Sequence, residues 1–296
     1  MKHFVYFFLL AMISGSLSSC QKVVFDDEEE GGGTNDAVSL RFRVTQFEQV
    51  PFDKADATRA TDVGKTCTRL NFAVYQNGER VKQLNQLSGD ASFGTFNLSL
   101  KPGRYLVVAL AHSSDENPTM TNPSKIPFTG VNKMTDTFWY GDTIVVDNDS
   151  AYQIKLKRAV AMFRLQATDT VPKGVKLVRF YFTGGSSTFD AVKGFGCVES
   201  KQTASFEITN DMIGRRMSFD AYTFPKADNK GLNMKITTHD AGANVLVEEN
   251  LSNVPIERNV ITLYKGRLFN RNAGSKGDFN LDFSSDDEWK VNEYPF

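Results

Sequence analysis

Short segments in which apolar and polar residues alternate recur along most of this 296-residue chain. Val38, Leu40, Phe42 and Val44, for example, are each separated by one polar residue. A period of two places one row of side chains in a core and the other in solvent, so it predicts a half-buried β-strand. Further segments with strand patterns lie at residues 70–74, 96–100, 105–111, 144–146, 152–156, 177–182, 206–208 and 217–222. Because 24 Phe and 9 Tyr also favour strands and no long helical periodicity precedes residue 158, the chain is predicted to be all-β.

A loose internal repeat predicts how these strands are grouped. The strand at 177–182, followed by Gly184-Gly185, resembles the strand at 70–75, followed by the hairpin turn Asn77-Gly78. We therefore expect two tandem β-sandwiches, at residues 37–158 and 159–296, rather than one large barrel. The segment 151–167 has no turn signal, so the chain is expected to pass directly from one sandwich into the next.

The N-terminus has the order of a secretory signal peptide. Lys2 precedes the apolar run Phe4–Ile13, and small residues lead to Cys20. The run is about half the ~20 residues that a membrane-spanning helix needs. Leu17-Ser18-Ser19-Cys20 resembles the lipobox of bacterial lipoproteins. The resemblance implies that residues 1–19 are removed between Ser19 and Cys20 and that acylated Cys20 anchors the protein in the outer membrane. The alternative is an ordinary signal peptide with a chance cysteine.

Residues 20–36 are predicted to form a flexible tether. Asp26–Glu30 is a run of acidic residues, and Gly31–Gly33 follows it directly. Low hydrophobicity with dense like charge cannot support a core. The acidic run also resembles the surface-export signal of lipoproteins from Bacteroidales-type bacteria, which implies a surface-exposed protein. The alternative is a solvated linker that carries no such address.

Composition argues against catalysis, metal binding and nucleic-acid binding. The net charge of −1 gives no electrostatic footprint for nucleic acid. Cys67 and Cys197 are expected to be reduced, buried and far apart. His112 and His239 have no spaced partner residues and are expected to be ordinary surface or turn histidines. We therefore expect no enzyme, no catalytic residue, no metal site and no cofactor.

Several segments resemble the FimB-type fimbrial anchor family. The segment 253–266, which contains Asn253-Val254-Pro255 and Arg258-Asn259, is similar to a block of that family. Leu156–Met162 is similar to the strand between its domains, and the hairpin at 100–105 and the lipobox match as well. The resemblance implies two transthyretin-like β-sandwich domains and a lipid-anchored subunit of a type V pilus on Bacteroidales-type cells. Its partners would be fimbrillin subunits, joined by β-strand complementation.

The same resemblance makes Arg59 a possible protease site. Polymerising relatives lose an N-terminal strand when a protease cuts after a basic residue in a loop. Arg59 lies in the polar stretch 55–62, and a cut there would release the strand at 38–44 together with the lipid. An anchor must keep both. The alternative is that Arg59 lies in an inert surface loop.

The C-terminal residues 278–296 carry two short alternating segments. The apolar positions are Phe279, Leu281, Phe283, Trp289 and Val291. A detached, extended segment with one apolar face is what a donor strand needs, and the donor segments of the polymerising relatives are C-terminal. The alternative is that both segments are the last strands of the second sandwich.

The alternative function is that of a pilus-tip adhesin or of a surface lipoprotein that binds glycans or proteins. This hypothesis depends on the aromatic residues Phe138-Trp139-Tyr140. Aromatic rings beside a carboxylate such as Asp142 can hold a sugar. Consecutive strand residues point to opposite faces, so these three rings cannot form one platform. A packing role for them is therefore favoured.

Overall fold

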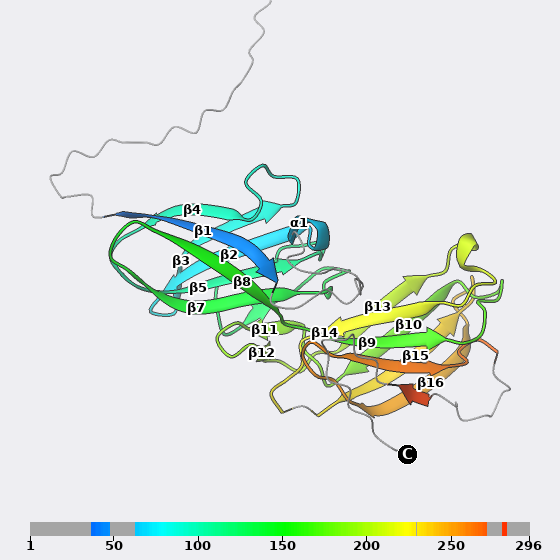
Figure 1. Cartoon of the computed structure of the whole chain (residues 1–296). Coiled ribbons are helices and arrows are strands. Elements are labelled where there is room, and N and C mark those ends of the chain that lie inside the picture. Colours follow the sequence, from blue (N-terminus) through cyan, green and yellow to red (C-terminus); the bar gives the residue numbers. More distant parts are fainter. Residues whose placement is uncertain (1–36, 48–62, 229, 271–279, 283–296) are drawn as a thin grey trace, which may run out of the picture. The chain divides into compact units, whose positions relative to one another are not determined.

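Strands dominate the computed structural model, which describes residues 37–47, 63–228, 230–270 and 280–282 (Figure 1). The helical elements in these ranges are the one-turn helix α1 (Val63–Thr66) and the 3-10 turn at Asn210–Met212. The predicted all-β fold is confirmed. In the same ranges, no helix is long and apolar enough to span a bilayer.

The first sandwich is built from one sheet in the order β3-β2-β5-β7-β8-β1-β4. Its strands are β1 (Val38–Phe47), β2 (Arg69–Gln76), β3 (Glu79–Leu87), β4 (Thr95–Leu100), β5 (Gly103–His112), β7 (Phe138–Val146) and β8 (Ser150–Arg158). β7 and β8 pair only through Phe138↔Arg158 and Trp139↔Lys157. The sheet folds at this corner, so β8-β1-β4 covers β3-β2-β5-β7 and encloses one core cluster.

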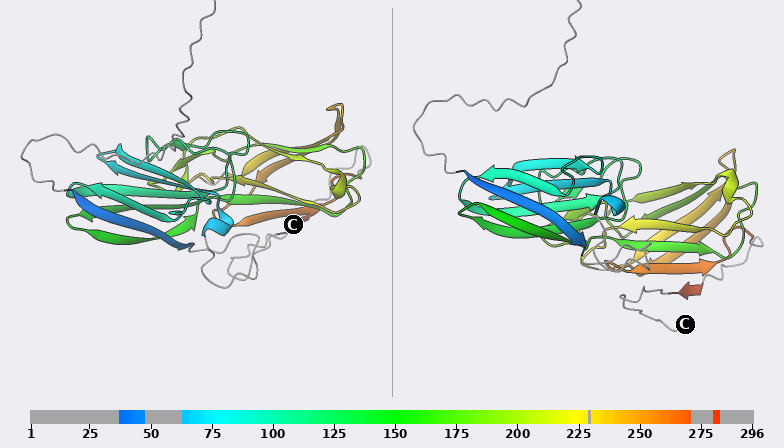
Figure 2. Two further views of the ribbon diagram at one scale, coloured as in Figure 1. Left: turned by 90° about the horizontal axis from the view of Figure 1, so that it is seen from above. Right: turned by 45° about the horizontal axis from the view of Figure 1, so that its top comes forward.

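The second sandwich has two four-stranded sheets, β13-β10-β15-β16 and β14-β9-β17-β18 (Figure 2). Its strands are β9 (Ala161–Ala167), β10 (Leu177–Thr183), β13 (Gln202–Glu207), β14 (Ser218–Thr223), β15 (Leu232–His239), β16 (Val245–Val254), β17 (Ile261–Gly266) and β18 (Asn280–Asp282). Phe163, Phe180 and Phe219 pack edge to face in the core between the sheets. β9 pairs in parallel with β17, much as β8 pairs in parallel with β1.

A small third sheet joins the two halves of the chain. β6 (Ile126–Pro127) comes from the first half and pairs with β11 (Thr188–Asp190), which pairs in turn with β12 (Phe195–Gly196). A shared core cluster surrounds this sheet and includes Phe128, Val160 and Phe189. Both sandwiches lie in one compact unit, Asp36–Phe296. The chain passes from β8 to β9 through buried Ala159 and Val160, and the boundary at residues 158–159 stays a prediction.

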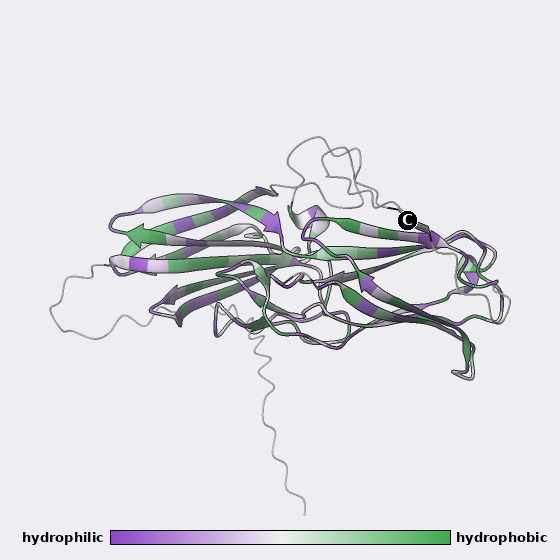
Figure 3. Ribbon diagram, turned by 90° about the horizontal axis from the view of Figure 1, so that it is seen from below, coloured by the Kyte–Doolittle hydropathy of each residue, from purple (hydrophilic) through white to green (hydrophobic). Residues whose placement is uncertain are grey.

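The alternation that predicted the strands is visible along the ribbons, where hydrophilic and hydrophobic residues follow one another (Figure 3). In β1, Val38, Leu40, Phe42 and Val44 are buried, while the residues between them are exposed. The Phe42 ring stacks on Tyr152, with ring centroids 4.9 Å apart and an interplanar angle of 11°. The predicted inward face of this strand is confirmed.

Candidate functional site

β1 lies between two partner strands, so both of its edges are occupied. Its backbone pairs in parallel with β8 from Leu40↔Ser150 to Phe47↔Leu156, and antiparallel with β4 from Val38↔Leu100 to Arg43↔Thr95. Releasing this strand would therefore break two ladders and expose its buried face. Ser19, Cys20 and Arg59 lie outside the described residues, so lipidation and cleavage stay predictions.

The C-terminal end of the second sandwich is fixed by one carboxylate. Asp169 accepts hydrogen bonds from the backbone N–H groups of Leu268, Phe269 and Asn270 at 2.9, 2.9 and 2.7 Å. Farther along the chain, β18 pairs antiparallel with β17, with Leu281 opposite Tyr264.

The pairing of β18 with β17 involves one of the predicted donor residues. Of the five predicted donor residues, Leu281 lies in β18, and Phe279, Phe283, Trp289 and Val291 lie outside the described residues. The donor strand and the last-strand alternative both stay predictions.

The aromatic residues Phe138-Trp139-Tyr140 are divided between the two faces of β7. Phe138 is buried in the first core, whereas Trp139 and Tyr140 are half-buried. The Trp139 ring packs edge to face on Phe189, with centroids 5.4 Å apart. This arrangement agrees with the predicted packing role.

A charged cluster that the sequence did not reveal ties the end of β8 to the loop before β17. Arg158 is fully buried and binds Asp136 through two hydrogen bonds, Nε to Oδ1 at 2.8 Å and Nη2 to Oδ2 at 2.9 Å. Its Nη1 donates to Asn259 Oδ1 at 2.7 Å, and its guanidinium lies 5.0 Å from the centre of the Phe138 ring. The neighbouring Arg258 donates to Gly194 O at 2.9 Å and lies over Phe195.

These contacts give a physical role to the segment 253–266 that resembles the fimbrial family. Its Arg258 and Asn259 side chains hold the loop against the β11–β12 turn and against β8. Asn259 has φ of 66°, a left-handed conformation that Asn adopts more readily than most residues. The segment thus fixes the junction between the sandwiches.

The expectations for the histidines and for one cysteine are wrong. His112 is fully buried, and His239 is 8% exposed. His239 contacts Thr237 Oγ1 at 2.9 Å and Ala243 O at 3.3 Å. Cys67 is buried as expected, and burial raises the pKa of its thiol. Cys197 is exposed, because it follows the short edge strand β12 instead of pointing into a core.

His112 is held as a neutral ring by its hydrogen bonds. Its Nδ1 accepts from the backbone N–H of Ser114 at 3.1 Å, so the ring proton is on Nε2, which donates to Asn71 Oδ1 at 2.6 Å. Burial, with a smaller effect from the Arg69 cation, lowers the pKa of His112 from 6.5 to about 4. A proton on Nδ1 would break the bond to Ser114.

We expect this histidine to make folding sensitive to acid. Because the unfolded chain binds the proton more tightly, the free energy of unfolding should fall by about 3 kcal/mol as the pH drops from 6.5 to 4. The contribution is fully present above pH 6.5. Urea denaturation at pH 7, 5 and 4 measures it. His112→Gln should remove this component and His239→Gln should not, and an unchanged pH dependence in His112→Gln would contradict the assignment.

In the part of the chain that the structure describes, no group of three or more His, Cys, Asp or Glu side chains is arranged to hold a metal ion.

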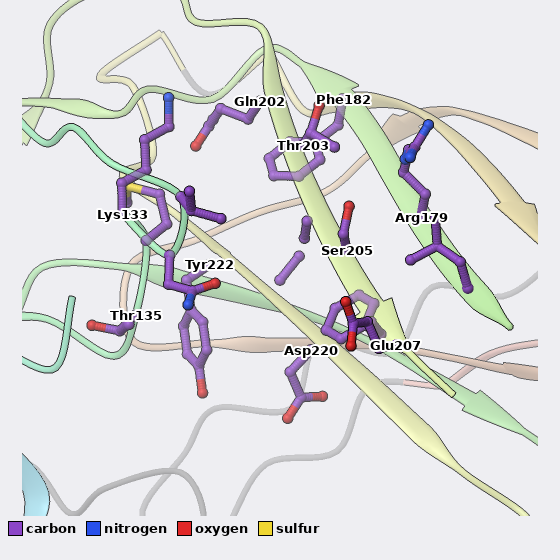
Figure 4. Close-up of a pocket in the computed structure, with 17 residues that line it drawn as sticks. Lys133, Thr135, Arg179, Phe182, Gln202, Thr203, Ser205, Glu207, Asp220 and Tyr222 are labelled. Carbon is purple, nitrogen blue, oxygen red and sulfur yellow. The ribbon is translucent and has the colours of Figure 1, made fainter. Parts of the chain in front are cut away.

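A pocket of about 840 Å³ lies between β13, β14 and the loop at 131–135. All six residues of β13 line it, and Asp220 and Tyr222 of β14 lie across from Thr203, Ser205 and Glu207 (Figure 4). The Asp220 carboxylate is bound by Arg164 at 2.7 and 2.6 Å. This pocket was not predicted, because β13 is only a weak pattern in the sequence.

Gln202 closes one end of the pocket. The side chain is 2% exposed, and its Nε2 donates to Thr223 Oγ1 at 2.8 Å, while its Oε1 has no hydrogen-bond partner. A buried amide oxygen without a donor costs about 1–3 kcal/mol. The Gln202 end of β13 and the Thr223 end of β14 meet here, and farther along the two strands the Phe206 and Phe219 rings lie with their centroids 5.3 Å apart.

Comparison with solved structures finds proteins that share this fold. A candidate adhesin from Bacteroides ovatus matches with a TM-score of 0.52 and 11% identity, over 83% of this chain and 92% of that chain. At this identity the match shows a shared fold, and it confirms at that level the predicted resemblance to Bacteroidales-type surface proteins.

Two fimbrial proteins are also similar. A fimbrial assembly protein from Parabacteroides distasonis has 13% identity and a TM-score of 0.40, over 83% of this chain and 95% of that chain. The tip fimbrial protein Mfa3 from Porphyromonas gingivalis, with a C-terminal truncation, has 12% identity and a TM-score of 0.39, over 84% of this chain and all of that chain. No curated protein sequence matches the chain.

A sequence profile for a family of unknown function, DUF6562, matches residues 30–296. The match covers both sandwiches and the C-terminal tail. The chain therefore belongs to the DUF6562 family.

Proposed function

We propose that this chain is a lipid-anchored cell-surface subunit that anchors or terminates a type V fimbria by β-strand complementation. Three kinds of observation support the proposal: the lipobox-like sequence that ends at Cys20, the fold shared with a candidate adhesin, and the position of β1. No cofactor or catalytic residue takes part.

The pairing of β1 carries most of the argument. An anchor must keep its N-terminal strand, because that strand links the lipid to the folded protein. β1 is paired on both sides and buries Val38, Leu40, Phe42 and Val44, and each such side chain contributes about 1.5–3 kcal/mol when it is fully buried. Loss of this strand would leave β8 and β4 without a partner between them.

An adhesin is the second candidate, and the structural similarity to the candidate adhesin from Bacteroides ovatus favours it. The half-buried Trp139, packed on Phe189, weakens the earlier hypothesis of a sugar platform at β7. Cells that lose attachment to a glycan or protein surface when this chain is deleted, but keep their fimbriae, would favour the adhesin.

Cys20→Ala is expected to abolish acylation, so that the protein leaves the membrane fraction and fimbriae are shed into the medium. The acyl chains supply the anchoring, at about 0.8 kcal/mol per buried methylene group. Membrane fractionation and mass spectrometry of the mature N-terminus measure the effect. Cys197→Ala is the control, since this exposed thiol is not at the cleavage site. A Cys20→Ala protein that still carries lipid and stays with membranes would refute the anchor.

A further inference from the structure

Edge strands in β-proteins are normally protected against the addition of another strand, by bulges, charges, proline or covering segments. β3 and β16 are edges of their sheets, and each has a register shift against its partner strand. At β4, the Gln86 side chain crosses from β3, accepts from Gly94 N–H at 2.9 Å and donates to Thr95 O at 2.8 Å. The open edge of β17 is paired by β18.

In the part of the chain that the structure describes, β13 lacks a bulge, a proline and a lysine, and the loop at 131–135 bounds the pocket beside its edge. β13 pairs with β10 from Gln202↔Phe182 to Glu207↔Leu177 without a register shift. Its sequence has no proline and no lysine, and its one charged residue is Glu207, at the end. Gln202, unlike Gln86, leaves its amide oxygen without a partner.

The backbone groups that face the open edge follow from the antiparallel pairing. Ile208 N–H donates to Lys176 O at 2.9 Å, on the β10 side, and the direction of bonding alternates along an antiparallel strand. Ala204 and Phe206 therefore also bond to β10. Thr203, Ser205 and Glu207 therefore direct their N–H and C=O groups away from β10. All three residues line the pocket (Figure 4).

The pocket beside this edge has the shape and chemistry that an extended peptide requires. It follows six strand residues, about 20 Å at 3.3–3.4 Å per residue. Ala204, Phe206 and Ala221 supply apolar surface for every second side chain of an added strand, and Ala204 and Phe206 are only half-buried without one. The charges that line the pocket cancel, so no excess charge of one sign repels a peptide. They are the basic Lys133 and Arg179 and the acidic Glu207 and Asp220.

We infer that β13 is an acceptor edge, to which an extended segment of a neighbouring fimbrial subunit adds as a fifth strand of the β13-β10-β15-β16 sheet. Backbone hydrogen bonds to Thr203, Ser205 and Glu207 would give affinity, and the apolar positions would select small or aliphatic side chains. The inference rests on the proposed fimbrial function and names one contact in it. It differs from the predicted donor tail, which would enter a different neighbour.

Hydrogen exchange in purified fimbriae, compared with the free full-length protein, tests the acceptor edge. The amides of Thr203, Ser205 and Glu207 should exchange more than about tenfold more slowly in fimbriae. The amides of Ala204 and Phe206, which already bond to β10, should change much less and serve as internal controls. Mass spectrometry with fragmentation to single residues separates the two sets.

Two variants at one position add an independent test. Ser205→Pro removes the outward N–H group, and proline is tolerated on an edge strand when that N–H faces away from the ladder. It should keep the fold and β13–β10 pairing, measured by thermal unfolding, but lose the fimbrial protection of Thr203 and Glu207. Ser205→Ala keeps the backbone donor and should behave as wild type.

The outcomes separate the two proposals. Protein that copurifies with fimbriae but shows unchanged exchange at Thr203, Ser205 and Glu207 overturns the acceptor edge alone. The acceptor edge is also overturned if the Thr203 and Glu207 amides of the Ser205→Pro protein are still fully protected in fimbriae. If the protein never copurifies with fimbriae, the proposed function is overturned. The acceptor edge then fails as well, because no neighbouring fimbrial subunit would supply the added strand.

Discussion

Asp136→Ala is expected to lower the free energy of unfolding by about 3–5 kcal/mol, because it leaves the Arg158 guanidinium buried without its counter-ion. The Arg158 side chain is fully buried, whereas that of Asp136 is 19% exposed, so the guanidinium is the group that would be left in the interior after the carboxylate is removed. Asn259 and the Phe138 ring would still contact the guanidinium, but neither is charged. Denaturant unfolding at neutral pH measures the change.

The second sandwich offers a matched control for this pair. Arg164 and Asp220 form the same two-bond geometry, at 2.7 and 2.6 Å, but their side chains are 25% and 24% exposed. Asp220→Ala should lower the free energy of unfolding by less than Asp136→Ala does, because the Arg164 guanidinium that it leaves behind is partly exposed and can be hydrated. If Asp136→Ala and Asp220→Ala lower the free energy of unfolding equally, burial does not determine how much the Arg158–Asp136 pair stabilises the protein.

Deletion of residues 285–296 is expected to abolish incorporation into fimbriae while leaving the protein folded. The expectation follows if the tail is a donor strand, because Asp169 and β18 fix the chain before the deleted residues. Thermal unfolding and limited proteolysis report on the fold, and immunoblots of purified fimbriae report on incorporation.

Paired substitutions in the tail sharpen the test. Trp289→Ser with Val291→Ser removes the apolar face that a donor strand would bury, whereas Glu288→Ser with Lys290→Ser changes the opposite face. Only the first pair should block incorporation. A truncated protein that joins fimbriae normally would exclude the donor strand, and one that is unstable and protease-sensitive would favour a last strand of the second sandwich.

Sequence periodicity predicted the parts of the fold that depend on local pattern. The inward face of β1 is buried as expected, and Asn77 and Gly78 have φ of 53° and 85°, which is the geometry of a two-residue hairpin turn. Alternation and turn residues are encoded within a few positions of one another, so a single sequence is enough to identify them.

Features that depend on distant partners were not predictable in the same way. The partners of Arg158 are distant in the sequence, with Asp136 at a separation of 22 residues and Asn259 at a separation of 101 residues. The residues next to Arg158 therefore do not indicate that it is buried. His112 was expected to be an ordinary surface or turn histidine because it has no spaced partner residues, but its ring is buried and bonded to Asn71 and to the backbone of Ser114. The pocket beside β13 exists only where two sheets and the loop at 131–135 meet, and strand patterns carry no information about that meeting.

The two parallel pairings have a consequence for the order in which the two sandwiches can fold. β1 can complete its ladder only after β8 has emerged, and β9 can complete its own only after β17 has emerged. Each sandwich must therefore close a loop of roughly a hundred residues before its core is enclosed, and such long-range pairing slows folding. During synthesis, which proceeds from the N-terminus, each half of the chain would thus stay open until most of that half has been made.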